Sequence, residues 1–165
     1  MKHCQGTLRE LIEDKSLVVN LVLMSISWSI TSFNFYLGKF QLKFVAGSIF
    51  RNTFFSAIAD ILGRPFGYII FKKWGAKVAL ICFFSLSVIG SFPVVFSEGA
   101  SQDYKDYVVP GCLFIMNTGT SSTFGILYMG HMDLFPIVFS TTSMAICNIL
   151  ARSCTIFAPI VAEIA

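Results

Sequence analysis

The sequence has few charged residues. Of its 165 residues, 13% are charged and 55% are hydrophobic, and phenylalanine alone occupies 18 positions. A soluble domain of this size would be about 25% charged, which supplies enough polar side chains to cover a water-exposed surface. The deficit excludes an ordinary water-soluble domain, and we expect lipid to be the solvent for much of the surface.

Signatures of several function classes are also missing. The 12 Lys and Arg residues are scattered along the chain, so we expect no nucleic-acid-binding surface. The 5 cysteines have neither a CxxC pair nor metal-site spacing, so we expect no disulfide, no metal and no cofactor. His3 and His131 lack metal-spaced companions, and neither a GxSxG nor a Walker motif occurs. We therefore expect the protein not to be an enzyme.

Long apolar stretches make up most of the chain. A helix needs about 20 residues to cross the roughly 30 Å hydrocarbon layer of a bilayer. The sequence therefore predicts an all-α integral membrane protein, multi-pass, with about five transmembrane helices at residues 17–38, 48–71, 78–97, 108–130 and 141–162. Residues 1–16 form a mixed-charge segment, and no linker divides residues 17–165, which we expect to be one helical membrane unit.

The positive charges predict the orientation in the bilayer. Lys and Arg in short loops are retained preferentially on the cytoplasmic side. With the amino terminus inside, the segment 1–16 is cytoplasmic, and so are Lys72, Lys73 and Lys77 in the second connection. Lys39 then falls in an outer connection.

Asp60, Arg64 and Arg152 fall well inside the predicted spans, where a charge costs roughly 2.5–3.5 kcal/mol on insertion scales. Asp60 and Arg64 are four residues apart, so they can form an ion pair within one helix. Arg152 has no acidic neighbour at helical spacing in its own span. Because a guanidinium binds carboxylate or sulfonate well, we expect Arg152 to contact an anionic solute. The alternative is a bridge from Arg152 to Asp60.

Polar and aromatic side chains supply further candidates for a solute cavity. The fourth span contains the unbroken polar run from Asn117 to Thr123, which either packs closely against other helices or lines water. Within the run, we expect Asn117 to face the cavity. Trp28 and Tyr36 in the first span are candidates for stacking on a solute. Aromatic residues near a membrane exit are more often interfacial anchors, the alternative that we favour for Tyr36.

One segment resembles the organic ion transporter branch of the major facilitator superfamily. Residues 56–80, SAIADILGRPFGYIIFKKWGAKVAL, are similar to the eighth helix and following loop of that family. Asp60 stands at the family's acidic position, and the loop with its gating charges would contain Lys72, Lys73, Gly75 and Lys77.

A second segment strengthens the resemblance. Residues 131–164 are similar to the family's Glu-Leu-Phe-Pro-Thr loop and eleventh helix, with Asp133 and Pro136 in the loop. Arg152 stands where organic anion transporters typically carry Arg and organic cation transporters carry Asp, so the resemblance implies anionic solutes. Ile137 and Ser140 replace the family's Thr and Arg, which implies a weakened network of charges at the gate.

The resemblance implies a fold and a role. The predicted spans would correspond to helices 7–11 of a twelve-helix major facilitator fold in the plasma membrane, which makes the chain a carboxyl-terminal half fragment. Its partners would be the lipid bilayer, a small organic ion and the missing amino-terminal transporter half. Such transporters alternate access around a midplane site, so we expect the fragment alone to be inactive. The alternative is a non-transporting helical membrane scaffold or partner-binding protein.

The membrane prediction is tested by extraction. We expect the expressed protein to remain in the membrane pellet after washing with alkaline carbonate, because peripheral proteins are released and membrane-spanning helices are not. Recovery of the protein as a water-soluble species would overturn every inference above.

Overall fold

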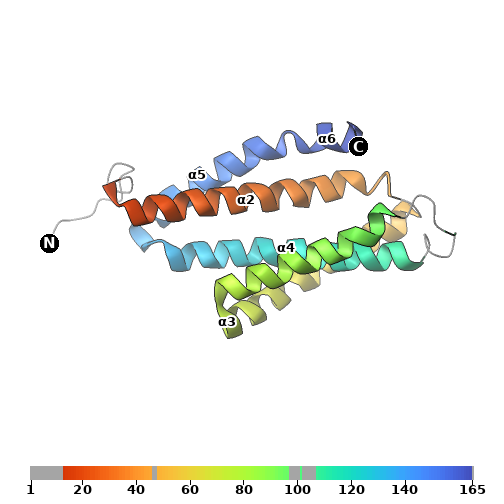
Figure 1. Ribbon diagram of the computed structural model, residues 1–165, viewed down its shortest axis with the longest axis horizontal. Helices are drawn as coiled ribbons and strands as arrows, with labels where there is room; N and C mark the ends of the chain where they lie inside the picture. The colour runs from red at the N-terminus through yellow and green to blue at the C-terminus, as the bar shows by residue number, and fades with distance from the viewer. Residues whose placement is uncertain (1–12, 46–47, 97–100, 102–106, 165) are drawn as a thin grey trace.

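The computed structural model describes residues 13–45, 48–96, 101 and 107–164, and over these ranges all regular structure is helical. The elements are α2 (Lys15–Gln41), α3 (Ile49–Val95), α4 (Val109–Leu134), α5 (Ile137–Thr155) and α6 (Ala158–Ile164). They lie side by side in one elongated bundle (Figure 1). The all-α prediction is confirmed for this part of the chain. Residues 1–12 of the predicted cytoplasmic segment lie outside it.

α3 consists of two helical arms joined by a sharp bend. Gly75 at the bend has φ 81° and ψ 171°, a left-handed conformation that glycine adopts without the steric cost of a Cβ atom. The chain therefore reverses at Gly75. The second arm (residues 76–95) runs back alongside the first arm (residues 49–74) in Figure 1. The two arms coincide with the second and third predicted spans.

Three helical stretches are long and apolar enough to cross a membrane. They are Lys15–Gln41, Ile49–Val94 and Ile137–Glu163, the last of which runs through α5 and α6. They support a membrane-embedded protein. α4 is not among them, because its central polar run lowers its hydropathy. That run is largely buried inside the bundle, so α4 has less need of an apolar surface.

α3 and α4 approach each other closely through glycines. A Cβ atom added to Gly90 would lie 2.5 Å from the backbone nitrogen of Met116, and one added to Gly119 would lie 2.7 Å from the backbone oxygen of Phe83. Neither distance is compatible with a side chain. Small residues allow this backbone contact, which replaces hydrophobic driving force as the source of helix association in lipid.

α2 packs on the other side of α4 and against α5. Trp28 of α2 is 1% exposed and belongs to a buried cluster with Leu127, Cys147 and Ala151. Ser25 of α2 also contacts the Cys147 sulfur, with 3.3 Å between Oγ and Sγ. These contacts fix which face of α5 lies on α2.

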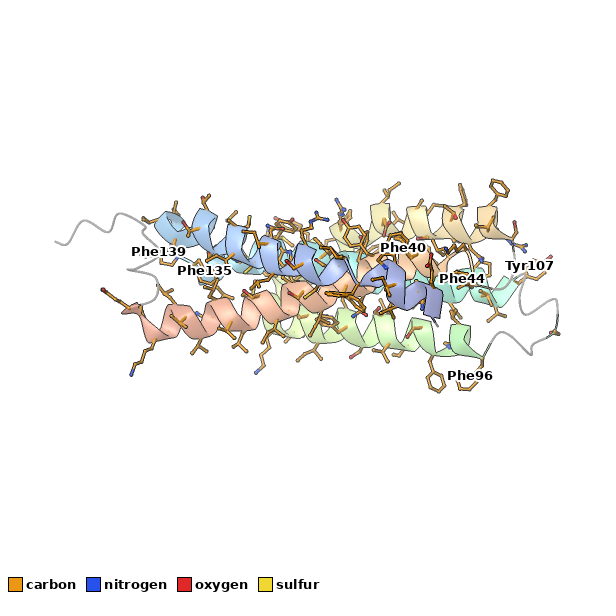
Figure 2. The ribbon with its side chains drawn as sticks, turned by 90° about the horizontal axis from the view of Figure 1, so that it is seen from above. Phe40, Phe44, Phe96, Tyr107, Phe135 and Phe139 are labelled. Carbon is orange, nitrogen blue, oxygen red and sulfur yellow. The ribbon has the colours of Figure 1, made fainter. Side chains whose placement is uncertain are left out.

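Aromatic side chains lie near both ends of the bundle (Figure 2). Phe40, Phe44, Phe96 and Tyr107 lie toward the end where α2 finishes, and Phe135 and Phe139 lie toward the opposite end. The first group is exposed, whereas the second is buried. Exposed aromatic rings at a helix end suit the interface between hydrocarbon and headgroups, which agrees with an axis that runs across the bilayer.

The glycine contact between α3 and α4 makes a prediction. Gly90→Ala should lower the free energy of unfolding by about 1–3 kcal/mol, because the new methyl group overlaps the backbone of α4. We would measure it by far-ultraviolet circular dichroism during reversible denaturation in mixed detergent and SDS micelles.

Gly125→Ala is the matched control, since nothing lies within 4 Å of a Cβ atom at Gly125. There the same change should be neutral or stabilise by up to about 1 kcal/mol through helix propensity. Equal effects at both glycines would show that the close contact does not determine the packing.

Candidate functional site

Arg152 of α5 reaches across to α2. Its Nη1 donates a hydrogen bond to the Tyr36 hydroxyl at 2.5 Å, and its guanidinium carbon lies 5.5 Å from the centre of the Tyr36 ring. Ala151, 1% exposed, packs against α2, which leaves the next side chain at the edge of that contact. Tyr36 is therefore a partner of Arg152, and its role as an interfacial anchor stays a prediction.

Asp60 of α3 pairs with Lys39 of α2. The Lys39 Nζ lies 2.6 Å from Asp60 Oδ2 and donates a second hydrogen bond, also 2.6 Å, to Ser56 Oγ. Neither of the two pairings considered for Asp60 is formed: over the described residues, the carboxylate pairs with neither Arg64 nor Arg152, and Arg64 is exposed.

α2 ends three residues beyond the predicted span. It continues to Gln41 and so includes Lys39, which we expected in the connection after the span. The predicted span ended at residue 38 because the hydrophobic run ends there, whereas helices commonly carry a basic residue in the last turn, where it interacts well with the helix dipole.

The two cations lie on neighbouring aromatic rings. Phe35 and Tyr36 contact each other edge to face, with ring centres 5.6 Å apart and an angle of 87° between the planes. Lys39 Nζ lies 5.2 Å from the Phe35 ring centre, and Arg152 lies over Tyr36. We call this group the cationic site; its members are Phe35, Tyr36, Lys39, Asp60 and Arg152.

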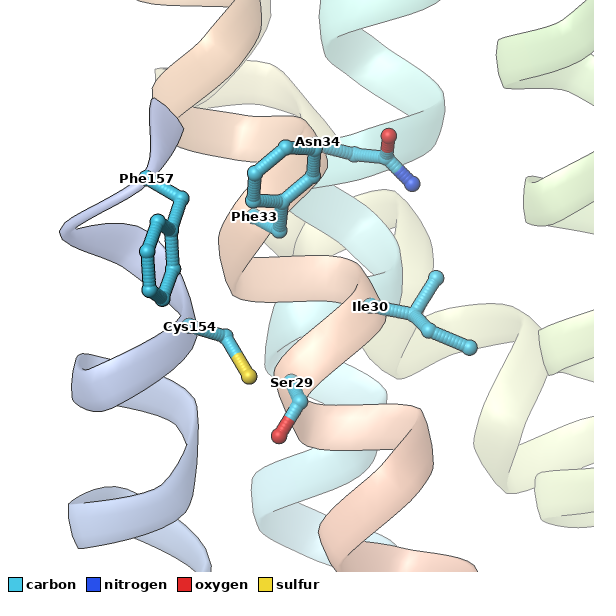
Figure 3. A pocket seen from close by; sticks show the side chains of 6 residues that line it. All are labelled: Ser29, Ile30, Phe33, Asn34, Cys154 and Phe157. Carbon is cyan, nitrogen blue, oxygen red and sulfur yellow. The ribbon is translucent and has the colours of Figure 1, made fainter. Parts of the chain in front are cut away.

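Two shallow surface hollows lie along α5, and Arg152 of the cationic site lines the first of them. One, of about 600 Å³, runs along α5 and is lined by Asn148, Ile149, Arg152, Ser153, Thr155 and Ile156. The other, of about 360 Å³, lies between α2 and the end of α5 and is lined by Ser29, Ile30, Phe33, Asn34, Cys154 and Phe157 (Figure 3). Asn34 points away from Cys154 and Phe157 in this view. The carboxyl-terminal half of α5 therefore presents a charge and apolar surface side by side.

Asn117 and Trp28 lie away from Arg152. Asn117 lines a cavity of about 220 Å³ between α2, α3 and α4, which Phe35 of the cationic site also lines, and its Nδ2 donates to the Leu113 carbonyl oxygen at 2.8 Å. Trp28 lies inside the bundle, with its ring 4.6 Å from that of Tyr128 and 5.8 Å from that of His131. The structure therefore does not bring either residue to Arg152.

The polar run of α4 forms close helix contacts. Ser121 Oγ donates to the Asp60 carbonyl oxygen at 3.2 Å, and Ser122 Oγ donates to that of Gly63 at 2.6 Å. Thr123 bonds within α4, to the Gly119 carbonyl oxygen at 2.9 Å. Of our two alternatives for this run, close packing is the one observed for its serines, and it connects α4 to the turn of α3 that carries Asp60.

The expected gating residues gather at the opposite end from the finish of α2. Lys72, Lys73 and Lys77 are exposed around the bend at Gly75. Asp133 and Pro136 are exposed where α4 passes into α5, and that connection lies at the same end as the start of α2 (Figure 1). Their arrangement at one end is what a gate would need; their role in gating stays a prediction.

The interpretation of Trp28 as a structural residue makes a prediction. Trp28→Ala should lower the free energy of unfolding by about 3–5 kcal/mol, because it removes a fully buried ring and leaves a cavity. The measurement is the same micellar denaturation. Trp74, 54% exposed, supplies the control, and Trp74→Ala should change stability by no more than about 0.5 kcal/mol. A loss of solute binding by Trp28→Ala without a loss of stability would contradict the structural role.

Over the described residues, no group of three or more His, Cys, Asp or Glu side chains could hold a metal ion. No protein-family model matches the chain.

Proposed function

We propose that the protein serves in the transmembrane transport of small organic anions, as the carboxyl-terminal part of a longer transporter of the major facilitator type. In this proposal the predicted spans are helices 7–11 of a twelve-helix fold, and the partner half supplies the other wall of the site. Long apolar helices and a bundle with charged residues between its helices support it. Ionisable residues at membrane depth commonly mark solute or ion pathways.

One observation carries the choice of anions, namely the neutral partner of Arg152. A phenolic hydroxyl accepts a hydrogen bond from the guanidinium but does not cancel its charge. The other two charges of the cationic site, Lys39 and Asp60, cancel each other. The site as a whole is therefore positive, and a carboxylate or sulfonate that reaches Arg152 would find a planar fork of donors next to an aromatic ring.

Binding of a labelled anion tests the proposal directly. The probe is radiolabelled benzoate, and the longer transporter that contains this chain is held in nanodiscs of zwitterionic lipid so that lipid charge does not compete. Arg152→Gln should weaken binding about tenfold or more, because a hydrogen bond to a charged group contributes about 1.5–3 kcal/mol. Arg152→Asp should abolish binding.

Lys43→Gln is the control. Lys43 lies one turn beyond Lys39 and faces Glu163 at 3.9 Å, with both side chains exposed, so its loss should not change benzoate binding. Benzoate affinity that survives Arg152→Asp would exclude the assigned role. Absence of binding by the unmodified longer protein, with both halves present, would favour the alternative, a non-transporting membrane scaffold.

A further inference from the structure

We propose that Lys39 is a second anion-binding residue of the cationic site and that Asp60 competes with the anion for it. The ligand would then be an aromatic anion with two separated acceptor groups, one bound by Arg152 and the other by Lys39. This inference rests on the proposed function, since it assumes that Arg152 binds an anion.

The geometry places both cations on the same side of α2. Tyr36 and Lys39 are three residues apart, so their side chains lie on one face of the helix in adjacent turns. Arg152 bonds to Tyr36, and Lys39 lies over the ring of Phe35, which contacts Tyr36. The two positive groups therefore flank a pair of aromatic rings, an arrangement that suits a ligand with an aromatic body and an acceptor at each end.

Lys39 can take another acceptor. Its side chain is 28% exposed, so a ligand can reach it. An ammonium group has three donors, and over the described residues two of them have partners, Asp60 and Ser56. The third can make the first contact with a ligand, whose negative charge then competes with Asp60 for the same ammonium group.

Asp60 is suited to compete for Lys39 because its own bonding is one-sided. Oδ2 accepts a hydrogen bond from the Lys39 ammonium group, whereas Oδ1 is buried and has no hydrogen-bond partner among the described residues. The nearby Ser121 hydroxyl donates to the backbone oxygen of Asp60 and leaves the carboxylate without that bond. The negative charge is thus balanced mainly by Lys39, so every interaction that Lys39 makes with a ligand is opposed by Asp60.

A comparison of two probes tests this arrangement. Benzoate has one anionic group, and 4-sulfobenzoate has two at opposite ends of one ring. In the same nanodiscs, Lys39→Gln should weaken 4-sulfobenzoate binding about tenfold and change benzoate binding much less, because only 4-sulfobenzoate reaches both cations. Lys39→Arg should retain the affinity for 4-sulfobenzoate, and Lys43→Gln should leave both affinities unchanged.

Asp60→Asn should change the affinity for 4-sulfobenzoate in the opposite direction. It should strengthen 4-sulfobenzoate binding several-fold, because Lys39 loses its competitor, and this gain should vanish when Lys39→Gln is added. Circular dichroism and gel filtration check the fold. Should Asp60→Asn misfold, we would compare the 4-sulfobenzoate affinity of the double variant, which removes both charges, with that of Lys39→Gln alone. Equal affinities support competition for Lys39, and a tighter double variant contradicts it.

The outcomes separate the two proposals. Loss of both affinities in Arg152→Gln, with no effect of Lys39→Gln on 4-sulfobenzoate, would overturn this inference and leave the proposed function intact. Unchanged affinities in Arg152→Gln would overturn both. Tighter 4-sulfobenzoate binding by Asp60→Asn even without Lys39 would show that Asp60 repels the ligand directly and does not compete for Lys39.

Discussion

The bundle depends on the contact between α3 and α4, where backbone touches backbone. In hydrocarbon, a hydroxyl or carbonyl without a hydrogen bond is costly, so α4 can carry a polar run only if its groups bond to helix backbone. Ser121 and Ser122 do so across the helix contact, at Asp60 and Gly63, and the glycines of both helices allow the approach. The same contact fixes the turn of α3 that carries the Asp60 carboxylate, so the charged pair with α2 follows from the packing.

The charged residues of the cationic site bond to partners on other helices and not to neighbours on their own helix. Arg64 is one turn from Asp60, yet the carboxylate pairs with Lys39 of another helix, which also donates a hydrogen bond to Ser56. A bond between helices positions α2 against α3, which a pair within one helix cannot do. Arg152 is left with a hydroxyl, and this difference between the two cations gives the site its net positive charge.

Much of the fold could be predicted from the sequence, because lipid demands long apolar helices and those are visible in composition. The arms of α3 were found despite the charge of Asp60, and the bend coincides with the lysine-rich connection containing Gly75. Partners across helices could not be predicted, since helical spacing reports only neighbours on one helix. Lys39 follows the last residue of the apolar run that defines the predicted span, whereas α2 continues to Gln41 and includes it.

The length of α2 has a consequence for the depth of the pair formed by Lys39 and Asp60. Its 27 residues extend about 40 Å at 1.5 Å per residue, more than the roughly 30 Å of hydrocarbon in a typical bilayer. A helix that spans the bilayer with this excess must tilt or project into the headgroup layer. Lys39 lies in the last turn of α2, yet it bonds to Asp60, which lies about three turns into α3. In a bilayer that α2 spans, this pair would connect the headgroup end of one helix to a deeper turn of another.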